Sequence, residues 1–197
     1  MSAERVCLFG GTFDPIHNAH LKMAKKAAAE FALDRVVFIP SGNPPHKQAR
    51  AVTPYEHRLA MVQLACAAIP VFEVSEMEAG RERSYTFHTL QRFREHLLPQ
   101  DKLFFLIGAD AFDEVDTWFR WKDVLGMTEF IVGSRPGAVY RIPPGARVLP
   151  LDDLQLPDAS RMIRANISAG EPTPELPSSV RAYIDRHHLY RTCSLDL

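Results

Sequence analysis

The run Lys102–Gly108, which reads KLFFLIG, constrains the fold more than any other segment of the chain. After its first residue it shows no alternation of polar and apolar side chains, which is typical of a strand buried on both faces. Helices cover both faces of a sheet when they connect parallel strands. The run therefore predicts a central strand of a parallel sheet.

Strand-like and helix-like segments alternate along the chain. Thr53, Pro54 and Glu56 illustrate the helix signals, because they form a capping box with proline in the first turn, and Thr53 is expected to be the cap. The alternation predicts an α/β fold: a single Rossmann-like domain with a parallel sheet and helices on both faces. The expected strands are Arg5–Phe9, Val36–Pro40, Val71–Ser75, Lys102–Gly108, Glu129–Gly133 and Arg147–Leu151, and the expected helices are His17–Phe31, Thr53–Cys66, Thr86–Leu97, Thr117–Leu125, Ser160–Ala169 and Pro177–His187.

Length and composition narrow the choice of function. A chain of 197 residues fits one domain, expected over 1–191, followed by a frayed tail at 192–197. The net charge of −1 gives no general attraction for a nucleic acid polymer. The sequence shows no signal-peptide pattern and no run of ~20 apolar residues, so we expect no membrane contact and a cytoplasmic protein. Cys7 and Cys66 stand in apolar runs without CxxC spacing, which indicates buried free thiols in a reducing compartment.

The segment Gly10–His20, GGTFDPIHNAH, follows the first expected strand. Two glycines allow the backbone to approach a ligand closely. His17 and His20 are three residues apart, so on a helix they share a face. At a helix N-terminus that face meets free N–H groups and the positive end of the dipole, which together suit an anion. The pair is therefore predicted to bind phosphate oxygens and to stabilise charge during phosphoryl transfer.

Other interpretations of this turn fit the sequence less well. The HxxH spacing could ligate zinc, but no third ligand stands nearby and HExxH is absent, so no protein-held metal site is expected. The missing GxGxxG pattern disfavours a redox dinucleotide enzyme. A single histidine at a helix start is usually a surface or capping residue, whereas two of them after Gly-Gly and Asp-Pro favour function.

The stretch Gly11–His20 resembles the GxFDPxHxGH signature of the nucleotidylyltransferase superfamily, with Ala19 where glycine is common. The resemblance implies that His17 and His20 contact the ATP phosphates and stabilise a pentavalent transition state. It also implies that Thr12 approaches the phosphates, and we group Gly10, Gly11 and Phe13 of the same turn with it.

From Val6 to Tyr190 the chain further resembles the bacterial nicotinate-nucleotide adenylyltransferases. This resemblance implies transfer of AMP from ATP to nicotinate mononucleotide, giving nicotinate adenine dinucleotide and pyrophosphate, by in-line attack without a covalent intermediate. ATP and the mononucleotide would be the partners, and Mg²⁺ would arrive with ATP and be held mainly by it. A sister enzyme for nicotinamide mononucleotide or phosphopantetheine, a non-catalytic nucleotide sensor, and a homo-oligomer stay open.

Several segments carry this second resemblance. In the segment Pro40–Lys47 it implies that His46 and Lys47 lie beside the phosphates and help to close the site, with Lys47 assigned to ATP and His46 to the mononucleotide, although a plain surface loop has the same composition. In the segment Ser84-Tyr85-Thr86 it implies that amides near Thr86 hold the pyridine carboxylate, while a simple helix cap remains the alternative.

The later segments extend it. Gly108-Ala109-Asp110 implies nucleotide contacts, with Gly108 on the ATP side and Asp110 toward a ribose or the mononucleotide, unless Asp110 only caps a helix. Trp118 corresponds to a stacking tryptophan, whereas we expect Trp121 to pack in the core. Arg135 could pair with phosphate on the mononucleotide side or form a structural salt bridge.

The last matching turn departs from the family pattern. Where the family reads ISSTxIR, this chain has Ser160, Arg161 and then Ile163-Arg164. The resemblance implies that Ser160 and Arg164 bind ATP phosphates. Arg161 falls where threonine is usual, so either it adds a second cation or the turn is rebuilt by one residue. The C-terminal stretch Leu176–Tyr190 resembles the last helix of the family, and we expect its side chains to pack in the core and to take no part in the chemistry.

Overall fold

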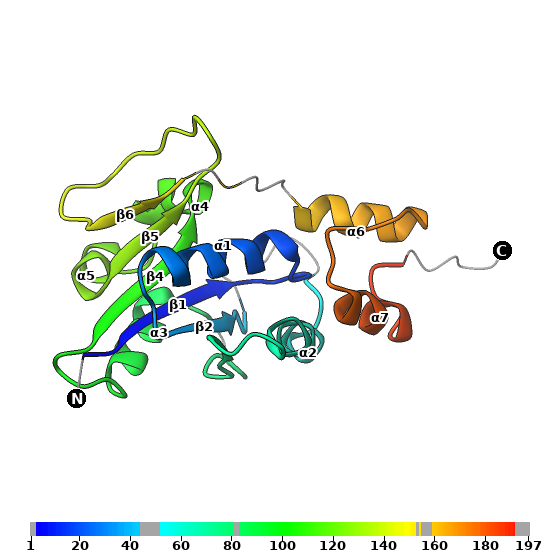
Figure 1. The fold of residues 1–197 in the computed structure, drawn as a ribbon, viewed down its shortest axis with the longest axis horizontal. Helices are drawn as coiled ribbons and strands as arrows, with labels where there is room; N and C mark the ends of the chain where they lie inside the picture. Colours follow the sequence, from blue (N-terminus) through cyan, green and yellow to red (C-terminus); the bar gives the residue numbers. More distant parts are fainter. Residues whose placement is uncertain (1–2, 44–51, 81–82, 153, 155–158, 192–197) are drawn as a thin grey trace.

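The computed structural model describes residues 3–43, 52–80, 83–152, 154 and 159–191. A six-stranded sheet with the order β3-β2-β1-β4-β5-β6 forms its centre, and every neighbouring pair is parallel (Figure 1). The order reverses direction between β1 and β4, which is where ligands of such sheets bind. The strands are β1 (Arg5–Gly11), β2 (Arg35–Pro40), β3 (Phe72–Val74), β4 (Lys102–Gly108), β5 (Glu129–Gly133) and β6 (Val148–Leu151).

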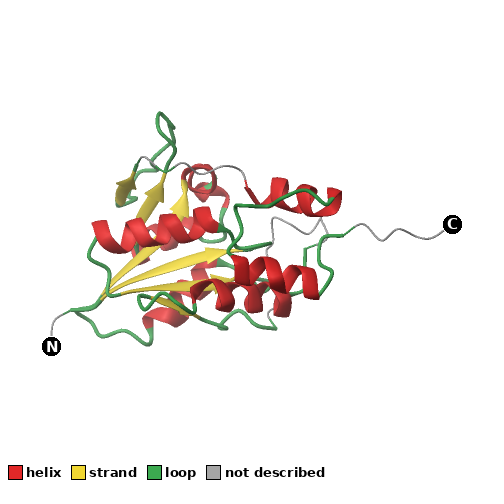
Figure 2. Ribbon diagram, turned by 45° about the vertical axis from the view of Figure 1, so that its right-hand side comes forward, coloured by secondary structure: helices red, strands yellow, loops and turns green. Residues whose placement is uncertain are grey.

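Helices cover both faces of the sheet (Figure 2). One face carries α1 and α2 with α6 and α7 beside them, and the other carries α3, α4 and α5. The buried side chains of each group of helices form a separate hydrophobic core with one face of the sheet. The predicted α/β, Rossmann-like fold is therefore confirmed. The helices are α1 (Asn18–Glu30), α2 (Tyr55–Cys66), α3 (Thr86–Arg94), α4 (Ala109–Asp113), α5 (Trp121–Met127), α6 (Ala159–Ala169) and α7 (Ser178–Arg186), and a 3₁₀ helix, η2, spans Val115–Thr117.

The alternation of side chains along the strands builds the two cores. In β1, Cys7 and Phe9 point to the α1 side, while Val6 and Leu8 point to the α3 side. In β4, all five residues of Leu103–Ile107 are buried, shared between the two cores, as predicted for a strand covered on both faces. Cys7 and Cys66 are buried and not in a disulfide, as the sequence indicated.

Two local predictions were wrong. Thr53 does not cap α2, because the helix begins at Tyr55 with Pro54 as its N-cap, and the Thr53 carbonyl instead accepts a bond from Arg58. The segment Thr117–Leu125 is not one helix. It is broken between η2 and α5 at Trp118–Arg120, where Arg120 takes the left-handed φ of 54°. A short helix that we did not predict, α4, follows β4 directly.

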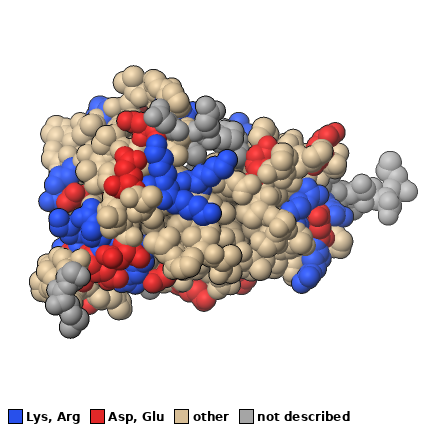
Figure 3. Space-filling model, viewed as in Figure 1, with Lys and Arg blue, Asp and Glu red and all other residues tan. Residues whose placement is uncertain are grey.

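Other element ends lie within a few residues of the prediction, and the expected tail at 192–197 falls outside the described residues. In the part of the chain that the structure describes, no helix is long and apolar enough to cross a membrane. On the face drawn in Figure 3, basic and acidic side chains are interspersed and do not form one extended basic surface, in keeping with the small net charge.

Candidate active site

Two cavities open at the carboxyl ends of the central strands. The first has a volume of about 370 Å³ and the second about 280 Å³. Gly10 at the end of β1, Ile107 in β4 and Ala111 in α4 line both cavities, so the two share a wall. This position is the switch point of the sheet, where the chain must leave β1 and β4 in opposite directions.

The two histidines form one rigid unit beside the first cavity. His17 is the N-cap of α1, and its backbone N–H donates to Nδ1 of His20 at 3.3 Å. The rings stack with centroids 3.7 Å apart at 26°, and Phe13 packs edge-on against His20. Both imidazoles line the cavity although His17 is only 5% exposed. They are therefore placed together at a helix N-terminus, as the spacing predicted, in a geometry that suits an anionic ligand.

The other side chains of the first cavity come from distant segments. Gly108 ends β4, Asp110 lies in α4, Arg135 follows β5, and Ser160 lies in the first turn of α6. The Ser160 hydroxyl donates to the Pro15 carbonyl at 3.3 Å, which joins α6 to the first turn. We had grouped Asp110 and Arg135 with the mononucleotide, but the structure places both in the cavity of the two histidines.

The second cavity is lined by more aromatic side chains than the first. Thr86 and Trp118, which the sequence assigns to the mononucleotide, both line it, together with Tyr85 and Phe119, whose rings lie 4.8 Å apart. Trp118 is held edge-on against Phe105 at 6.1 Å. A flat ring between aromatic walls, next to the N-terminus of α3, is the ligand that such a cavity accommodates. Gly11 and Thr12, which we had placed at the phosphates, line this cavity as well.

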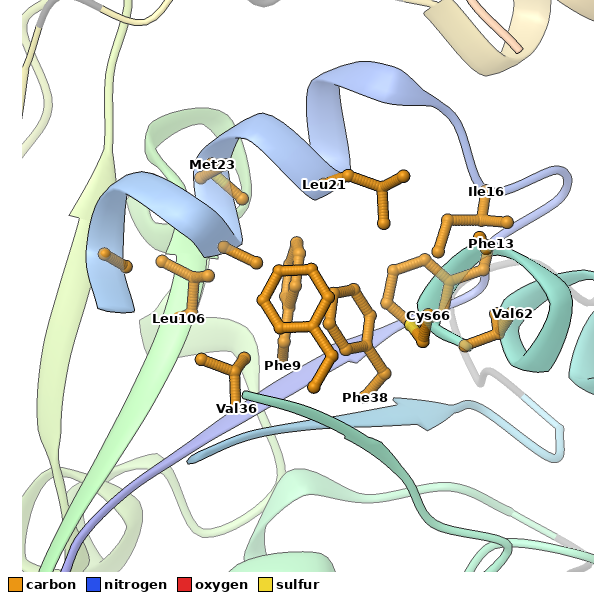
Figure 4. Close-up of a cluster of buried hydrophobic side chains, with 14 of the residues drawn as sticks. Phe9, Phe13, Ile16, Leu21, Met23, Val36, Phe38, Val62, Cys66 and Leu106 are labelled. Carbon is orange, nitrogen blue, oxygen red and sulfur yellow. The ribbon is translucent and has the colours of Figure 1, made fainter. Parts of the chain in front are cut away.

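Several predicted site residues do not line either cavity. The Phe13 side chain is 3% exposed and packs in the core among Ile16, Phe38 and Val62, so only its backbone could meet a phosphate (Figure 4). Arg164 turns its guanidinium to the first turn, where Nη1 donates to the Asp14 carbonyl at 2.6 Å. His46 and Lys47 lie outside the described residues.

The two remaining assignments concern Arg161 and Trp121. Arg161 is exposed on α6 and is absent from the lining of both cavities, so the geometry does not favour it over Ser160 as the phosphate-side residue. Trp121 is partly buried against the core on the α3 side, which confirms its expected packing role.

A buried acid behind the first turn was missed by the sequence analysis. Asp14 is 7% exposed, and its carboxylate accepts bonds from the Tyr190 hydroxyl at 2.7 Å and the Thr53 N–H at 3.4 Å. Burial and the adjacent Asp14 charge raise the pKa of Tyr190. We had interpreted Asp14 only as part of a bend and Tyr190 only as packing, and nothing in their local sequence signals that they meet.

Arg58 was also missed, although its position carried a signal. It lies on the buried stripe of α2 with Met61, Val62 and Ala65, at a helical spacing reserved for apolar residues. Its side chain is 1% exposed, and burial lowers the pKa of its guanidinium while the nearby Asp14 carboxylate opposes that effect. A charged residue on such a stripe calls for several buried partners.

The described residues contain no group of three His, Cys, Asp or Glu side chains that could hold a metal ion. Asp110 is the one carboxylate among the lining residues of the first cavity. The two imidazoles, the guanidinium of Arg135 and the hydroxyl of Ser160 are instead groups that bind phosphate oxygens. The arrangement can thus bind a polyphosphate in one cavity and an aromatic compound in the next.

Comparison with known proteins gives a consistent result. The cytidylyltransferase-like family model matches residues 8–176. A probable nicotinate-nucleotide adenylyltransferase of Solibacter usitatus is 48% identical over 186 residues, which cover 94% of this chain and 99% of the relative. One of Desulfitobacterium hafniense is 43% identical, covering 95% and 96%. The fold also resembles that of Plasmodium falciparum nicotinic acid mononucleotide adenylyltransferase complexed with APC, with a TM-score of 0.77, 17% identity and coverage of 95% and 97%.

Proposed function

We propose the activity of this chain from one premise: it belongs to the cytidylyltransferase-like family and, within it, to the nicotinate-nucleotide adenylyltransferases. It transfers AMP from ATP to nicotinate mononucleotide, with nicotinate adenine dinucleotide and pyrophosphate as products, a step of NAD biosynthesis. The observation that carries this proposal is the pair of cavities that meet at Gly10, one beside stacked histidines and the other lined by aromatic rings.

ATP occupies the first cavity in this proposal, and the mononucleotide occupies the second. The α-phosphorus then lies near the shared wall at Gly10, where no Cβ obstructs the approach of phosphate to the backbone. The pyridine ring lies against Trp118, and amides near Thr86 receive its carboxylate.

The reaction needs positioning and charge stabilisation more than covalent chemistry. A 5′-phosphate oxygen of the mononucleotide attacks the α-phosphorus in line, and the bond to the pyrophosphate oxygen breaks. His17 and His20 donate hydrogen bonds to the phosphate oxygens, whose charge rises in the transition state. The bond from the His17 backbone N–H holds the His20 ring, and the His17 ring stacks against it.

Mg²⁺ accompanies ATP in this proposal. It keeps several waters and needs few protein ligands, which fits a cavity with one carboxylate, that of Asp110. When bound it would neutralise phosphate charge. The protein side chains that complete this neutralisation are those of His17, His20 and Ser160, with Lys47 and His46 assigned to the same role by the family resemblance.

Two roles are revised within the proposal. Arg135, in the first cavity, pairs with an ATP phosphate and not with the mononucleotide. Arg164 binds the Asp14 carbonyl and thereby supports the turn that carries the histidines. We assign the whole of 1–191 to one catalytic domain, and we place the enzyme in the cytoplasm because its buried thiols, Cys7 and Cys66, suit a reducing compartment.

A pyrophosphate-release assay with ATP tests the activity. Nicotinate mononucleotide should support the fastest release, and nicotinamide mononucleotide and phosphopantetheine serve as competing substrates. Faster turnover of either competitor would identify a sister enzyme, and nucleotide binding without pyrophosphate release would identify a sensor.

The variant His17→Ala tests the site. Its turnover should fall by ~10²–10³-fold, because one hydrogen bond aimed at developing charge contributes about that much. His57→Ala is the matched control, since His57 on α2 bonds to Tyr183 on α7 and lines neither cavity. Parental turnover in His17→Ala would refute the assignment of the first cavity.

A further inference from the structure

Arg58 is the largest fully buried side chain in the described part of the molecule, yet it lines neither cavity. Its guanidinium donates to three backbone carbonyls: to Thr12 at 2.7 Å, to Thr53 at 2.8 Å and to Gly42 at 3.3 Å. The Thr12 carbonyl belongs to the turn after β1, the Thr53 carbonyl to the segment that enters α2, and the Gly42 carbonyl to the loop after β2. The planar fork of an arginine is the side chain that can reach three such acceptors at once.

Both backbone polar groups of Gly42 are hydrogen-bonded to buried side chains. Its carbonyl accepts from Arg58, and its N–H donates to the Glu78 carboxylate at 3.3 Å. Glu78 is itself 7% exposed and accepts a bond from the Thr89 hydroxyl on α3. A Cβ added at Gly42 would overlap the backbone carbonyl oxygen of Glu78, so the loop passes as close to Glu78 as a peptide can.

The groups tied together in this way border the second cavity. Thr12, Ser41 and Glu78 all line it. The Ser41 N–H also donates to the Gly11 carbonyl at 2.8 Å, which continues the pairing of β1 with β2 beyond the strands. Arg58 thus fixes, from inside the protein, the spacing between the turn that leads to the histidines and the loop that walls the aromatic cavity.

A buried charge is a costly way to hold a backbone. Apolar residues of similar size are often as good for stability, so a buried charge by itself is weak evidence of a stabilising role. The bonds from Arg58 to the Thr12 and Gly42 carbonyls suit a different role, which is to fix two backbone segments at a set distance. Misplacement of bound reactants by 1 Å can cost ~10²-fold in rate.

We propose that Arg58 is a positioning residue that sets where the wall of the mononucleotide cavity lies relative to the turn that leads to His17 and His20, by holding Thr12 and Gly42. The proposal rests on the proposed function for the meaning of the two cavities. Arg58 touches no substrate, and its effect passes through the backbone. Binding of ATP alone is then preserved without Arg58, whereas the productive alignment of the mononucleotide with ATP is lost.

The experiment compares Arg58→Met and Arg58→Lys with the parental enzyme. Binding-competent sites are counted by calorimetric titration with ATP alone, and turnover is expressed per site. Arg58→Met should bind ATP with parental affinity but turn over ~10²-fold more slowly, and Arg58→Lys, which keeps the charge but not the fork, should fall between. A merely structural role would lower the number of sites and leave turnover per site unchanged, which would overturn the proposal.

Arg5→Met is the matched control. Arg5 donates to the Phe31 carbonyl at 2.9 Å and lies over the Phe104 ring, at the other end of β1. Arg5→Met removes one arginine–carbonyl bond where Arg58→Met removes three, so stability should fall while turnover per site stays parental. A loss of turnover equal to that of Arg58→Met would overturn the proposal, and if Arg58→Met does not fold, Arg58→Lys must still show the loss.

A readout that needs no catalysis separates the two proposals. Amide hydrogen exchange at Ser41 and Gly42 should accelerate by at least ~10-fold in Arg58→Met or Arg58→Lys and stay parental in Arg5→Met. Unchanged exchange would overturn the role of Arg58 even if the enzyme is active. If the parental protein forms no dinucleotide while exchange is accelerated in the Arg58 variants as expected, the proposed function alone is overturned.

Discussion

The contact between Tyr190 and Asp14 gives a prediction that can be worked through in numbers. The Tyr190 hydroxyl donates at 2.7 Å to Oδ1 of Asp14, an acid that is 7% exposed and lies three residues before His17. Tyr190→Phe removes this donor and, with it, the hydrogen bond between the Tyr190 hydroxyl and the Thr53 side chain. Among the described residues, the other carboxylate oxygen keeps the longer bond from the Thr53 N–H, at 3.4 Å, so a buried charge loses its shorter hydrogen bond.

The expected cost follows from that loss. Hydrogen bonds to charged groups contribute about 1.5–3 kcal/mol. For a chain of 197 residues, 1 kcal/mol corresponds to about 2–4 °C in Tm, so Tm should fall by about 3–12 °C. A similar loss in Asp14→Asn, with a coupling of about 0.5–3 kcal/mol in the double-mutant cycle, would assign the effect to this pair.

Calorimetric melting at pH 7 measures both quantities. Tyr183→Phe is the control, because its hydroxyl bonds to His57 at 2.9 Å in a half-buried pair away from Asp14. The reasoning is refuted if Tyr190→Phe loses no more stability than Tyr183→Phe, or if the cycle with Asp14→Asn shows no coupling.

Three further expectations follow from the same structure. Gly42→Ala should lose about 1–3 kcal/mol in urea unfolding because its Cβ overlaps Glu78, whereas Gly126→Ala, whose Cβ meets open space in a helix, should be neutral or stabilising; equal effects would contradict this. Trp118→Ala should weaken mononucleotide binding about three- to tenfold in calorimetric titration and leave ATP binding unchanged, and parental mononucleotide affinity would exclude stacking. Burial raises the pKa of the Cys66 thiol from 9.0 to about 12. The unfolded chain therefore releases this proton first, stability falls by about 1.4 kcal/mol per pH unit between these values, and Cys66→Ala should flatten the slope; an unchanged slope would contradict it.

Helix starts and uninterrupted apolar runs could be predicted from the sequence where local chemistry decides. The five buried residues of β4 and the helix that starts just after His17 follow from patterns within single segments. The broken helix near Trp118 was not readable, because aromatic packing against Phe105 and the α3 side decides where the chain turns. Propensity is a weak guide where such tertiary contacts compete with it.

The sequence by itself determined the parallel α/β architecture and the pairing of His17 with His20, because the order of strand-like and helix-like segments and the helical spacing of the two histidines are carried locally by the chain. Only the tertiary structure decided that Asp110 and Arg135 share a cavity with these histidines, that Phe13 is buried, and that Arg58, Asp14 and Tyr190 support the turn. Asp14 and Tyr190 are 176 positions apart. Contacts over such separations are set by how β1, α2 and the C-terminal segment pack together, and no local pattern records that packing.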